Sequence, residues 1–274
     1  MRSPLILAAA AFSALVGLVA GAILLTSAWL DFAGDRSAGT RDVYRVHAAL
    51  ADAFRAAATR DFSIGAFDAE LAGAIASADA SIAAATIVTR AGAVMLTDET
   101  IQSPELAAIA GDARFFDFFT SGGPAAVPDA PGVWLTRSGA ARLSAAGGGL
   151  GPRVRSGEAL LDVLGVIDDP RPGSHLVYEA VLTGAGVQAG RDGALYVRTR
   201  DRAAAARALG PVLARAEGFP AGVLDARLTR FADIRLSPRP DLGTPSFIVA
   251  GQRLEFVVAL ITGGAAAAGA ALSV

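Results

Sequence analysis

The chain has 274 residues, a formal net charge of −2, no cysteine, and 53% hydrophobic residues with a mean hydropathy of +0.47. This length suffices for one or two domains with a proper core. The charge offers no basic stripe for nucleic acid, and the lack of cysteine excludes disulfide frameworks, thiolate metal sites and thiol nucleophiles. The hydropathy is high for a soluble protein and modest for a polytopic one, which favours a globular domain with a few membrane spans.

The first apolar segment, Pro4 to Leu30, contains no ionisable residue and exceeds the roughly 20 residues that span a bilayer. Trp29 lies at its outer end, where an indole ring favours the membrane interface. The alternative is a cleaved signal peptide that starts at Arg2 and ends at the small residues Thr26 to Ala28. The apolar stretch of a signal peptide has only about 7–15 residues. We therefore predict a retained transmembrane helix.

The second apolar segment, Phe256 to Val274, is also free of charge and is rich in Ala and Gly. It fits a buried C-terminal helix or a second membrane span. Because a helix that is apolar all round has no polar face to turn to water, we favour the span. The predicted organisation is a cytoplasmic end and first transmembrane helix at 1–31, an extracytoplasmic domain at 32–253, and a second transmembrane helix at 254–274.

The first half of the central domain alternates between helical and strand-like patterns. The stretch Arg41–Ala58 has helical spacing of its apolar residues, although Asp42–His47 fits a strand equally well. The pattern then predicts, in chain order, a helix over Ala66–Ala84, a hairpin of strands Thr86–Thr89 and Ala93–Leu96 around Ala91–Gly92, and a short helix over Pro104–Ala110.

An aromatic cluster follows, formed by Phe115, Phe116, Phe118 and Phe119. We interpret it as core packing.

The second half of the domain continues the alternation of strands and helices, which favours an α+β fold over an all-β one. Thr136 is placed to cap a helix, and either Thr199 or Asp201 is placed to cap another. The expected elements are strand Val133–Leu135, helix Arg137–Ala145, the apolar strand Ala159–Ile167 ended by Asp168–Gly173, strand Leu195–Arg198, helix Asp201–Ala216, and the closing segments Leu224–Leu228 and Ile234–Leu236.

No motif in the sequence supports catalysis. His47 and His175 are far apart and lack metal-ligand spacing, and the nucleophile-elbow pattern GxSxG is absent. The glycines at Gly147–Gly151 lack the Lys-Ser/Thr of a phosphate-binding loop. Ser174 beside His175 fits a hydrogen-bonded turn, since adjacent strand residues point to opposite faces. The pair Asp168–Asp169 fits a solvated turn better than a cation site. We predict no catalytic, cofactor-binding or metal residues, and no enzyme.

The order of several segments resembles the periplasmic core domain of MacB/FtsX-like ABC-transporter permeases. The most specific stretch, Val163–Leu176, reads VLGVIDDPRPGSHL and is similar to the family's VTGVIKDLPxNSHL. The other matches, each partial, are Asp42–Val46, Asp112–Phe119, Val133–Leu143, Gly147–Arg153 and Leu228–Leu236. Their joint order over most of the central domain is the specific signal.

This resemblance implies a two-lobed α+β domain of mixed sheets and helices on the outer side of the bacterial inner membrane, with one lobe formed by both ends of the domain and the other by its middle. It also implies that the pair Phe115–Phe116 ends a strand-like segment inside the middle lobe, near the strand Ala159–Ile167, with at least one ring almost fully buried and Asp117 turned to solvent. It also implies a cytoplasmic ABC ATPase subunit as the partner that hydrolyses ATP, so no cofactor is expected on this chain. Family members carry further transmembrane helices, so the chain is expected to be truncated or half of a permease. The other partners are the remaining permease helices or a second permease subunit, and the lipid bilayer.

Two functions therefore stand open. The first is a permease component of an ABC-type export or mechanotransmission system, which couples ATP-driven motion to an extracytoplasmic domain. The second is a stand-alone membrane-tethered binding or sensor domain, favoured by the missing helices. An extracytoplasmic hydrolase is a distant third, because the sequence lacks catalytic motifs.

Overall fold

The computed structural model describes residues 15–23, 25–26, 38–55, 63–91, 94–96, 104–120, 123–148, 153–171, 174–184, 187 and 192–236. Within these ranges no helix is both long and apolar enough to cross a membrane. Most of the predicted first span and all of the predicted second span lie outside the described residues. Residues 15–23 and 25–26 are helical and expose apolar side chains, among them Leu18 at 59% and Ile23 at 63%.

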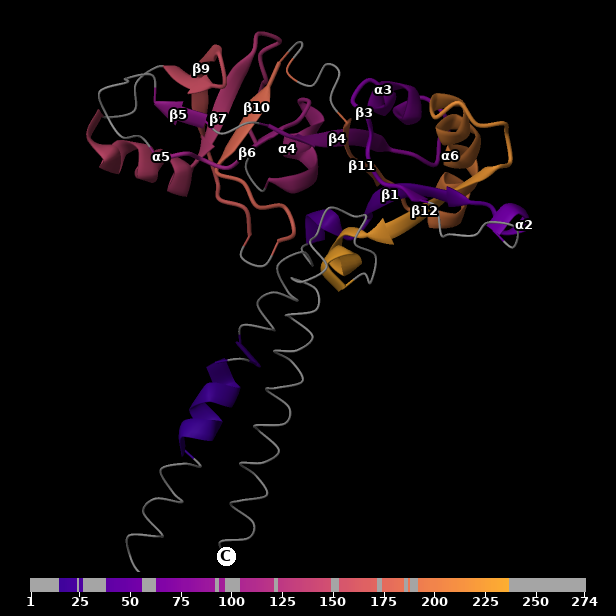
Figure 1. The fold of residues 1–274 in the computed structure, drawn as a ribbon, viewed down its shortest axis with the longest axis horizontal. Helices are drawn as coiled ribbons and strands as arrows, with labels where there is room; N and C mark the ends of the chain where they lie inside the picture. Colours follow the sequence, from indigo (N-terminus) through magenta and orange to yellow (C-terminus); the bar gives the residue numbers. More distant parts are fainter. Residues whose placement is uncertain are drawn as a thin grey trace, which may run out of the picture.

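The first lobe combines the beginning and the end of the described domain. Its strands and helices are β1 (Val43–Leu50), α2 (Asp52–Arg55), β2 (Ser63–Ile64), β3 (Phe67–Asp68), α3 (Leu71–Ala76), β4 (Ala84–Arg90), β11 (Asp192–Arg198), α6 (Arg202–Ala216) and β12 (Leu224–Arg230), flanked by the 3-10 helices η1 (Ala38–Thr40) and η3 (Phe231–Leu236). Figure 1 shows the purple elements β1, β3, β4 and α3 together with the orange elements α6 and β12 in this lobe.

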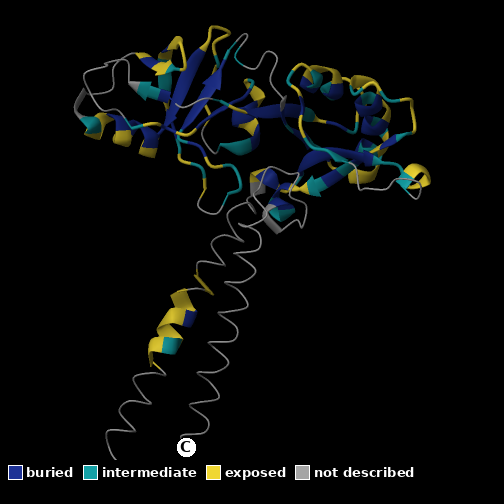
Figure 2. Ribbon diagram, viewed as in Figure 1, coloured by how far each residue is buried: buried dark blue, intermediate teal, exposed yellow. Residues whose placement is uncertain are grey.

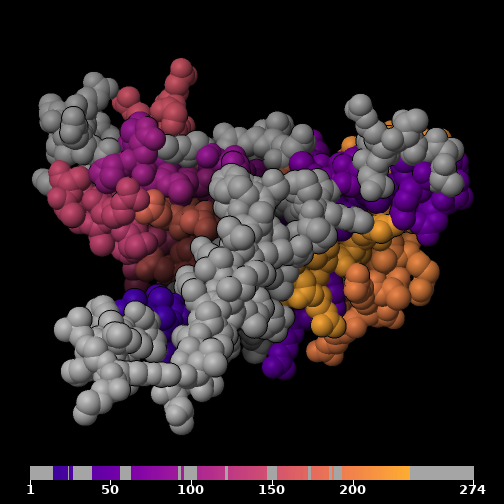
Figure 3. All heavy atoms as spheres, turned by 60° about the horizontal axis from the view of Figure 1, so that its bottom comes forward, coloured from indigo at the N-terminus to yellow at the C-terminus, as the bar shows by residue number. Residues whose placement is uncertain are grey.

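The second lobe is formed by the middle of the chain. Its elements are β5 (Val94–Leu96), β6 (Ala108–Ala110), β7 (Gly132–Thr136), α5 (Arg137–Leu143), the π-helical turn η2 (Ser144–Gly148), β8 (Arg153–Ser156), β9 (Ala159–Ile167) and β10 (Ala180–Thr183). Helix α4 (Arg114–Phe119) lies between the two lobes (Figure 1). The same division is visible on the surface, where magenta atoms lie on one side and purple and orange atoms on the other (Figure 3).

One mixed sheet runs through both lobes in the order β12-β1-β11-β4-β6-β10-β7-β9-β8-β5. The lobes meet at the antiparallel pair β4–β6, which aligns Thr89 with Ala110 and Arg90 with Ile109. Parallel pairs β6–β10 and β7–β9 occur only in the second lobe of the described sheet. The lobes implied by the resemblance are therefore present, but they share one continuous sheet.

Three buried clusters hold this sheet in place (Figure 2). The first-lobe core packs α3 and α6 on one sheet face, with Ile75 and Leu209 fully buried. The second-lobe core packs α5 on β7 and β10, with Leu135 and Leu143 fully buried. The third, here named the bridging cluster, contains residues of both lobes, from Val43 in β1 to Ile167 in β9, together with α4 and η3. Burial on this scale is the main favourable contribution to folding.

Several predicted elements are confirmed. Strand β7 precedes helix α5, and the Thr136 side chain caps this helix by accepting a hydrogen bond from the Gly139 amide at 3.0 Å. Helix α6 begins after Asp201, whose carboxylate accepts from the Ala204 amide at 2.9 Å. Of the two caps left open by the sequence, Asp201 is the one used. Strand β1 likewise settles the ambiguity over Asp42–His47 in favour of a strand.

Three predictions from local pattern are wrong. The short helix over Pro104–Ala110 is absent, because Ala108–Ala110 is a buried strand between β4 and β10. The hairpin around Ala91 is also absent, since β4 pairs with β11 and β6 while β5 pairs with β8. The helix over Ala66–Ala84 is reduced to α3, after which the Asp79 carboxylate accepts from the Ser81 amide and turns the chain.

Two further expectations need correction in part. Strand β9 exists, but it is less buried than its apolar sequence indicates: Leu160 and Val166 are 51% and 53% exposed, and Asp162 pairs with Arg153 at 2.8 Å. The Phe115–Phe116 pair belongs to helix α4 and does not end a strand-like segment.

Candidate functional site

The structure places Ser174 and His175 in a turn whose polar groups have structural partners. The Ser174 hydroxyl oxygen accepts from the Leu176 amide at 3.2 Å, and the Ser174 amide donates to the Arg171 carbonyl at 3.0 Å. The His175 Nε2 atom lies 3.0 Å from the Tyr196 hydroxyl, and its ring packs on Phe231 with centroids 4.4 Å apart. These contacts fit the predicted hydrogen-bonded turn and direct the imidazole into the bridging cluster.

The acidic turn at Asp168 and Asp169 is tied to the start of α5. Asp168 forms an ion pair with Arg137 at 2.7 Å, and Asp169 accepts from both the amide and the hydroxyl of Ser138 at 2.9 and 2.6 Å. Burial alone would raise the pKa of Asp169, but the hydrogen bonds from Ser138 outweigh it, so the net pKa is lowered. The described residues contain no group of three or more His, Asp or Glu side chains that could hold a metal ion.

The bridging cluster is built around helix α4. Phe115, Phe116 and Phe118 are at most 3% exposed, while Asp117 is exposed, as expected from the sequence. The Phe116 ring meets Trp134 of the second lobe edge to face at 5.6 Å. The Phe119 ring meets Tyr196 of the first lobe at 5.0 Å. Rings in these geometries attract beyond their burial, so α4 fastens one lobe to the other.

Polar contacts around α4 reinforce this connection. The Thr86 hydroxyl of β4 donates to the Asp112 carboxylate at 2.6 Å, just before the helix. Burial raises the pKa of Asp112, against the opposing effects of the Thr86 hydrogen bond and the Arg114 charge. Arg198 of β11 donates to the Asp117 carbonyl at 3.0 Å and stacks over the Phe118 ring at 4.8 Å. The start of α4 is therefore held by β4, and its end by β11.

Burial also raises the pKa of the tyrosine hydroxyl at the second-lobe side of the cluster. Tyr178 is 2% exposed and meets the Phe115 ring at 5.6 Å. Its burial, with a smaller contribution from the Asp169 charge, raises its pKa to about 12. Its burial and its contact with Phe115 make Tyr178 a packing residue of this cluster.

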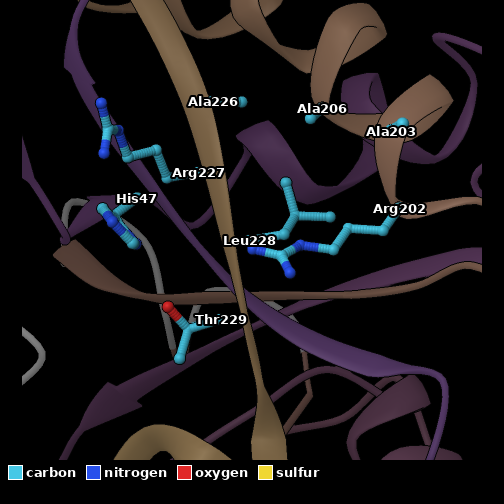
Figure 4. A pocket seen from close by; sticks show the side chains of 8 residues that line it. All are labelled: His47, Arg202, Ala203, Ala206, Ala226, Arg227, Leu228 and Thr229. Carbon is cyan, nitrogen blue, oxygen red and sulfur yellow. The ribbon is translucent and has the colours of Figure 1, made fainter. Parts of the chain in front are cut away.

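A separate cavity of about 480 Å³ lies at the outer strand of the first lobe (Figure 4). Strand β12 contributes Ala226, Arg227, Leu228 and Thr229, helix α6 contributes Arg202, Ala203 and Ala206, and β1 contributes His47. The strand register aligns His47 with Arg227, so these two side chains share a sheet face. Figure 4 shows them on one side of β12 and the α6 residues on the other.

Sequence patterns gave no indication of this cavity. His47, Arg202 and Arg227 come from three separate elements, and only the pairing of β1 with β12 and the packing of α6 bring them together. Nothing in the spacing of these residues encodes that arrangement.

No family model and no curated protein matches the sequence. Solved structures do match the fold. A domain of a protein described as a permease from Porphyromonas gingivalis is 21% identical, covers 70% of this chain and 91% of its own, and gives a TM-score of 0.54. The extracellular domain of the ABC-type transporter YknZ from Gram-positive bacteria is 10% identical, covers 68% and 99%, and gives a TM-score of 0.50.

The periplasmic region of MacB from Actinobacillus actinomycetemcomitans also matches, at 15% identity, 72% and 92% coverage and a TM-score of 0.49. At such identities, likeness establishes fold alone. The domain thus has the fold of the permease domain and of the transporter extracellular domain described above, and the mixed α/β fold implied by the sequence resemblance is confirmed. The flanking transmembrane helices stay a prediction.

Proposed function

We propose that the chain is a membrane component of an ABC-type export or mechanotransmission system that couples ATP-driven motion to an extracytoplasmic domain. The observation that carries this proposal is the fold match to a permease domain, which is covered over 91% of its length. In this proposal, the domain at 32–253 lies outside the bacterial inner membrane, between spans at 1–31 and 254–274.

The position of the two ends of the domain supports this topology. The chain enters the sheet through β1 and leaves it through β12, and these strands are direct neighbours with Tyr44 aligned to Arg230. Two flanking segments therefore leave the lobe from adjacent points, as two neighbouring membrane helices require. The exposed apolar side chains of the helical residues 15–23 are the kind of surface that lipid covers.

The partners follow from the same proposal. ATP is hydrolysed by a cytoplasmic ABC ATPase subunit, and the remaining permease helices, or a second permease subunit, complete the membrane part. The second candidate function, a stand-alone membrane-tethered binding or sensor domain, is favoured by the cavity lined by Arg202 and Arg227. It predicts the same topology but needs no ATPase.

Topology is tested with reporters that are active on only one side of the membrane. A reporter after Val274 is expected in the cytoplasm, and one inserted near Gly122 is expected outside. Both reporters on the same side would contradict the two-span topology. Co-purification of the tagged full chain with an ABC ATPase then separates the two functions, because a stand-alone sensor would be isolated without one.

A further inference from the structure

We propose that Arg198 is a latch that holds helix α4 in place between the lobes, and that its release lets the two lobes turn against each other. The proposal concerns the motion of the domain itself and does not depend on the permease role. It rests on one side chain that contacts separate parts of the fold, and on a buried nitrogen of that side chain that has no hydrogen-bond partner.

The side chain of Arg198, the last residue of β11, joins α4 to the 3-10 helix η1 that precedes β1. Its Nη2 atom donates to the Asp117 carbonyl of α4 at 3.0 Å and to the Gly39 carbonyl of η1 at 3.3 Å. The central carbon of the guanidinium group lies 4.8 Å from the centre of the Phe118 ring, where a cation is attracted by the ring face. We call these contacts the Arg198 latch.

The Arg198 latch leaves one donor of the guanidinium group unsatisfied. The Nε atom is buried and has no hydrogen-bond partner among the described residues. The Asp42 carboxylate lies 3.7 Å from Nε, which is within the range of an ion pair but too far for a hydrogen bond. Buried donors nearly always have a partner, so an unpaired one needs a physical reason. A shift of less than about 1 Å would bring Asp42 into hydrogen-bond distance of this nitrogen.

Asp42 and α4 therefore compete for the same guanidinium group. Because this group is planar and rigid, a rotation that brings Nε onto the Asp42 carboxylate moves Nη2 away from the two carbonyls. The backbone of Asp42 stays beside β11, since its carbonyl accepts from the Thr199 amide at 2.9 Å. Its carboxylate thus remains within reach of Arg198 in both arrangements. The result is a side chain with two alternative sets of partners, one of which includes α4.

Loss of the Arg198 latch weakens the attachment of α4 to the first lobe. The end of the helix, Asp117–Phe119, would keep the contacts of the Phe119 ring with Tyr196 and Phe231, at 5.0 and 5.2 Å, but no polar contact with the first lobe among the described residues. The sheet itself joins the lobes through only two aligned residue pairs of β4 and β6. Release of α4 therefore frees the lobes to change their relative angle, as packed elements do in discrete steps.

The first test measures the distance between the lobes. The chain has no cysteine, so Ala141→Cys on α5 and Arg207→Cys on α6, both at exposed positions, place one spin label on each lobe. Double electron–electron resonance on the full chain in detergent gives the distribution of distances between the labels. Arg198→Ala should broaden this distribution. Arg215→Ala, at an exposed arginine of α6, is the matched control and should leave it unchanged.

The second test follows α4 itself by hydrogen exchange of the segment 114–120 and mass spectrometry. Arg198→Ala should speed this exchange about tenfold, the change expected when a hydrogen bond to a charged group is lost. Asp42→Asn should slow it by about twofold, because the competing ion pair is removed and Arg198 stays on α4. Asp225→Asn, at an exposed carboxylate of β12, is the matched control for the loss of a negative charge.

The Asp42→Asn variant separates a latch from a merely structural arginine. A structural ion pair would make α4 exchange faster when Asp42 is neutralised, whereas a competitor makes it slower. Unchanged or faster exchange in Asp42→Asn would overturn the proposal, as would unchanged distances and exchange in Arg198→Ala. If Arg198→Ala does not fold, the Asp42→Asn result decides alone. Neither test contains an ATPase or a membrane topology measurement, so failure of the latch leaves the proposed permease role untouched, and the reverse also holds.

Discussion

Truncation of Phe115 to alanine should strongly destabilise the domain. The Phe115 ring is fully buried and meets the rings of Phe116, Phe119 and Tyr178 with centroids 5.5, 5.1 and 5.6 Å apart. On its remaining side lies Gly111, so close that an added Cβ there would stand 2.8 Å from the Phe115 Cβ. Because rings surround the site, the cavity left by the substitution cannot collapse easily.

Removal of such a ring costs about 3–5 kcal/mol of unfolding free energy. For a domain of about 200 residues, 1 kcal/mol shifts the melting temperature by about 2–4 °C, so we expect a decrease of about 6–20 °C. The measurement is thermal unfolding of the full chain, followed by circular dichroism. Phe54→Ala is the matched control, because Phe54 is 47% exposed on α2 and should melt within about 2 °C of the unchanged chain. Equal melting of the Phe115→Ala and Phe54→Ala variants would refute the core assignment and make α4 a binding surface instead.

Two further predictions concern close packing and buried charge. Gly139→Ala should lower the unfolding free energy by about 1–3 kcal/mol, because the added Cβ would stand 2.4 Å from the Glu179 carbonyl oxygen. Gly73→Ala should raise the unfolding free energy by about 0.5–1 kcal/mol, because Gly73 lies on α3 with nothing within 4 Å of the added Cβ. Urea unfolding measures both variants, and destabilisation by both would contradict the packing around Gly139. Burial raises the pKa of Asp112 in the folded chain above its ordinary value of 3.8. Protonation of Asp112 therefore stabilises the folded state, fully at pH values below 3.8, and this contribution is lost as the pH rises through the raised pKa. Asp112→Asn should flatten the stability curve in that pH window while keeping a polar partner for Thr86, and an unchanged curve would show that Asp112 titrates normally.

Local sequence rules identified the elements whose ends carry their own signals. Thr136 precedes α5 and Asp201 precedes α6, and in both places a short polar side chain satisfies a backbone amide of the first helical turn. The run of phenylalanines was likewise recognisable as core, because four large apolar rings within five residues need burial somewhere.

The same rules failed where long-range pairing decides the structure. The stretch Pro104–Ala110 contains three alanines, one glutamate and one leucine and therefore has a helical propensity. Its last residues occupy a central position in the sheet, and burial between β4 and β10 overrides that propensity. Strands β4 and β5 are close enough in sequence for a hairpin, yet they enter different lobes. The cavity at His47 depends on the register of β1 and β12, which no local pattern specifies.

The connection between the lobes determines whether the domain can act as a lever. The sheet crosses from one lobe to the other through the short β4–β6 pair, which aligns only two pairs of residues. Each backbone hydrogen bond contributes about 1 kcal/mol net, so this pairing alone would resist rotation of the lobes weakly. The rings of Phe116 against Trp134 and of Phe119 against Tyr196 lie across the same junction and are mostly shielded from water. Rotation would have to open that packing, which behaves like an organic crystal and does not deform smoothly. The stiffness of this junction therefore resides in α4, and in the permease role proposed above, motion delivered to β1 and β12 would reach the second lobe only while this helix stays packed.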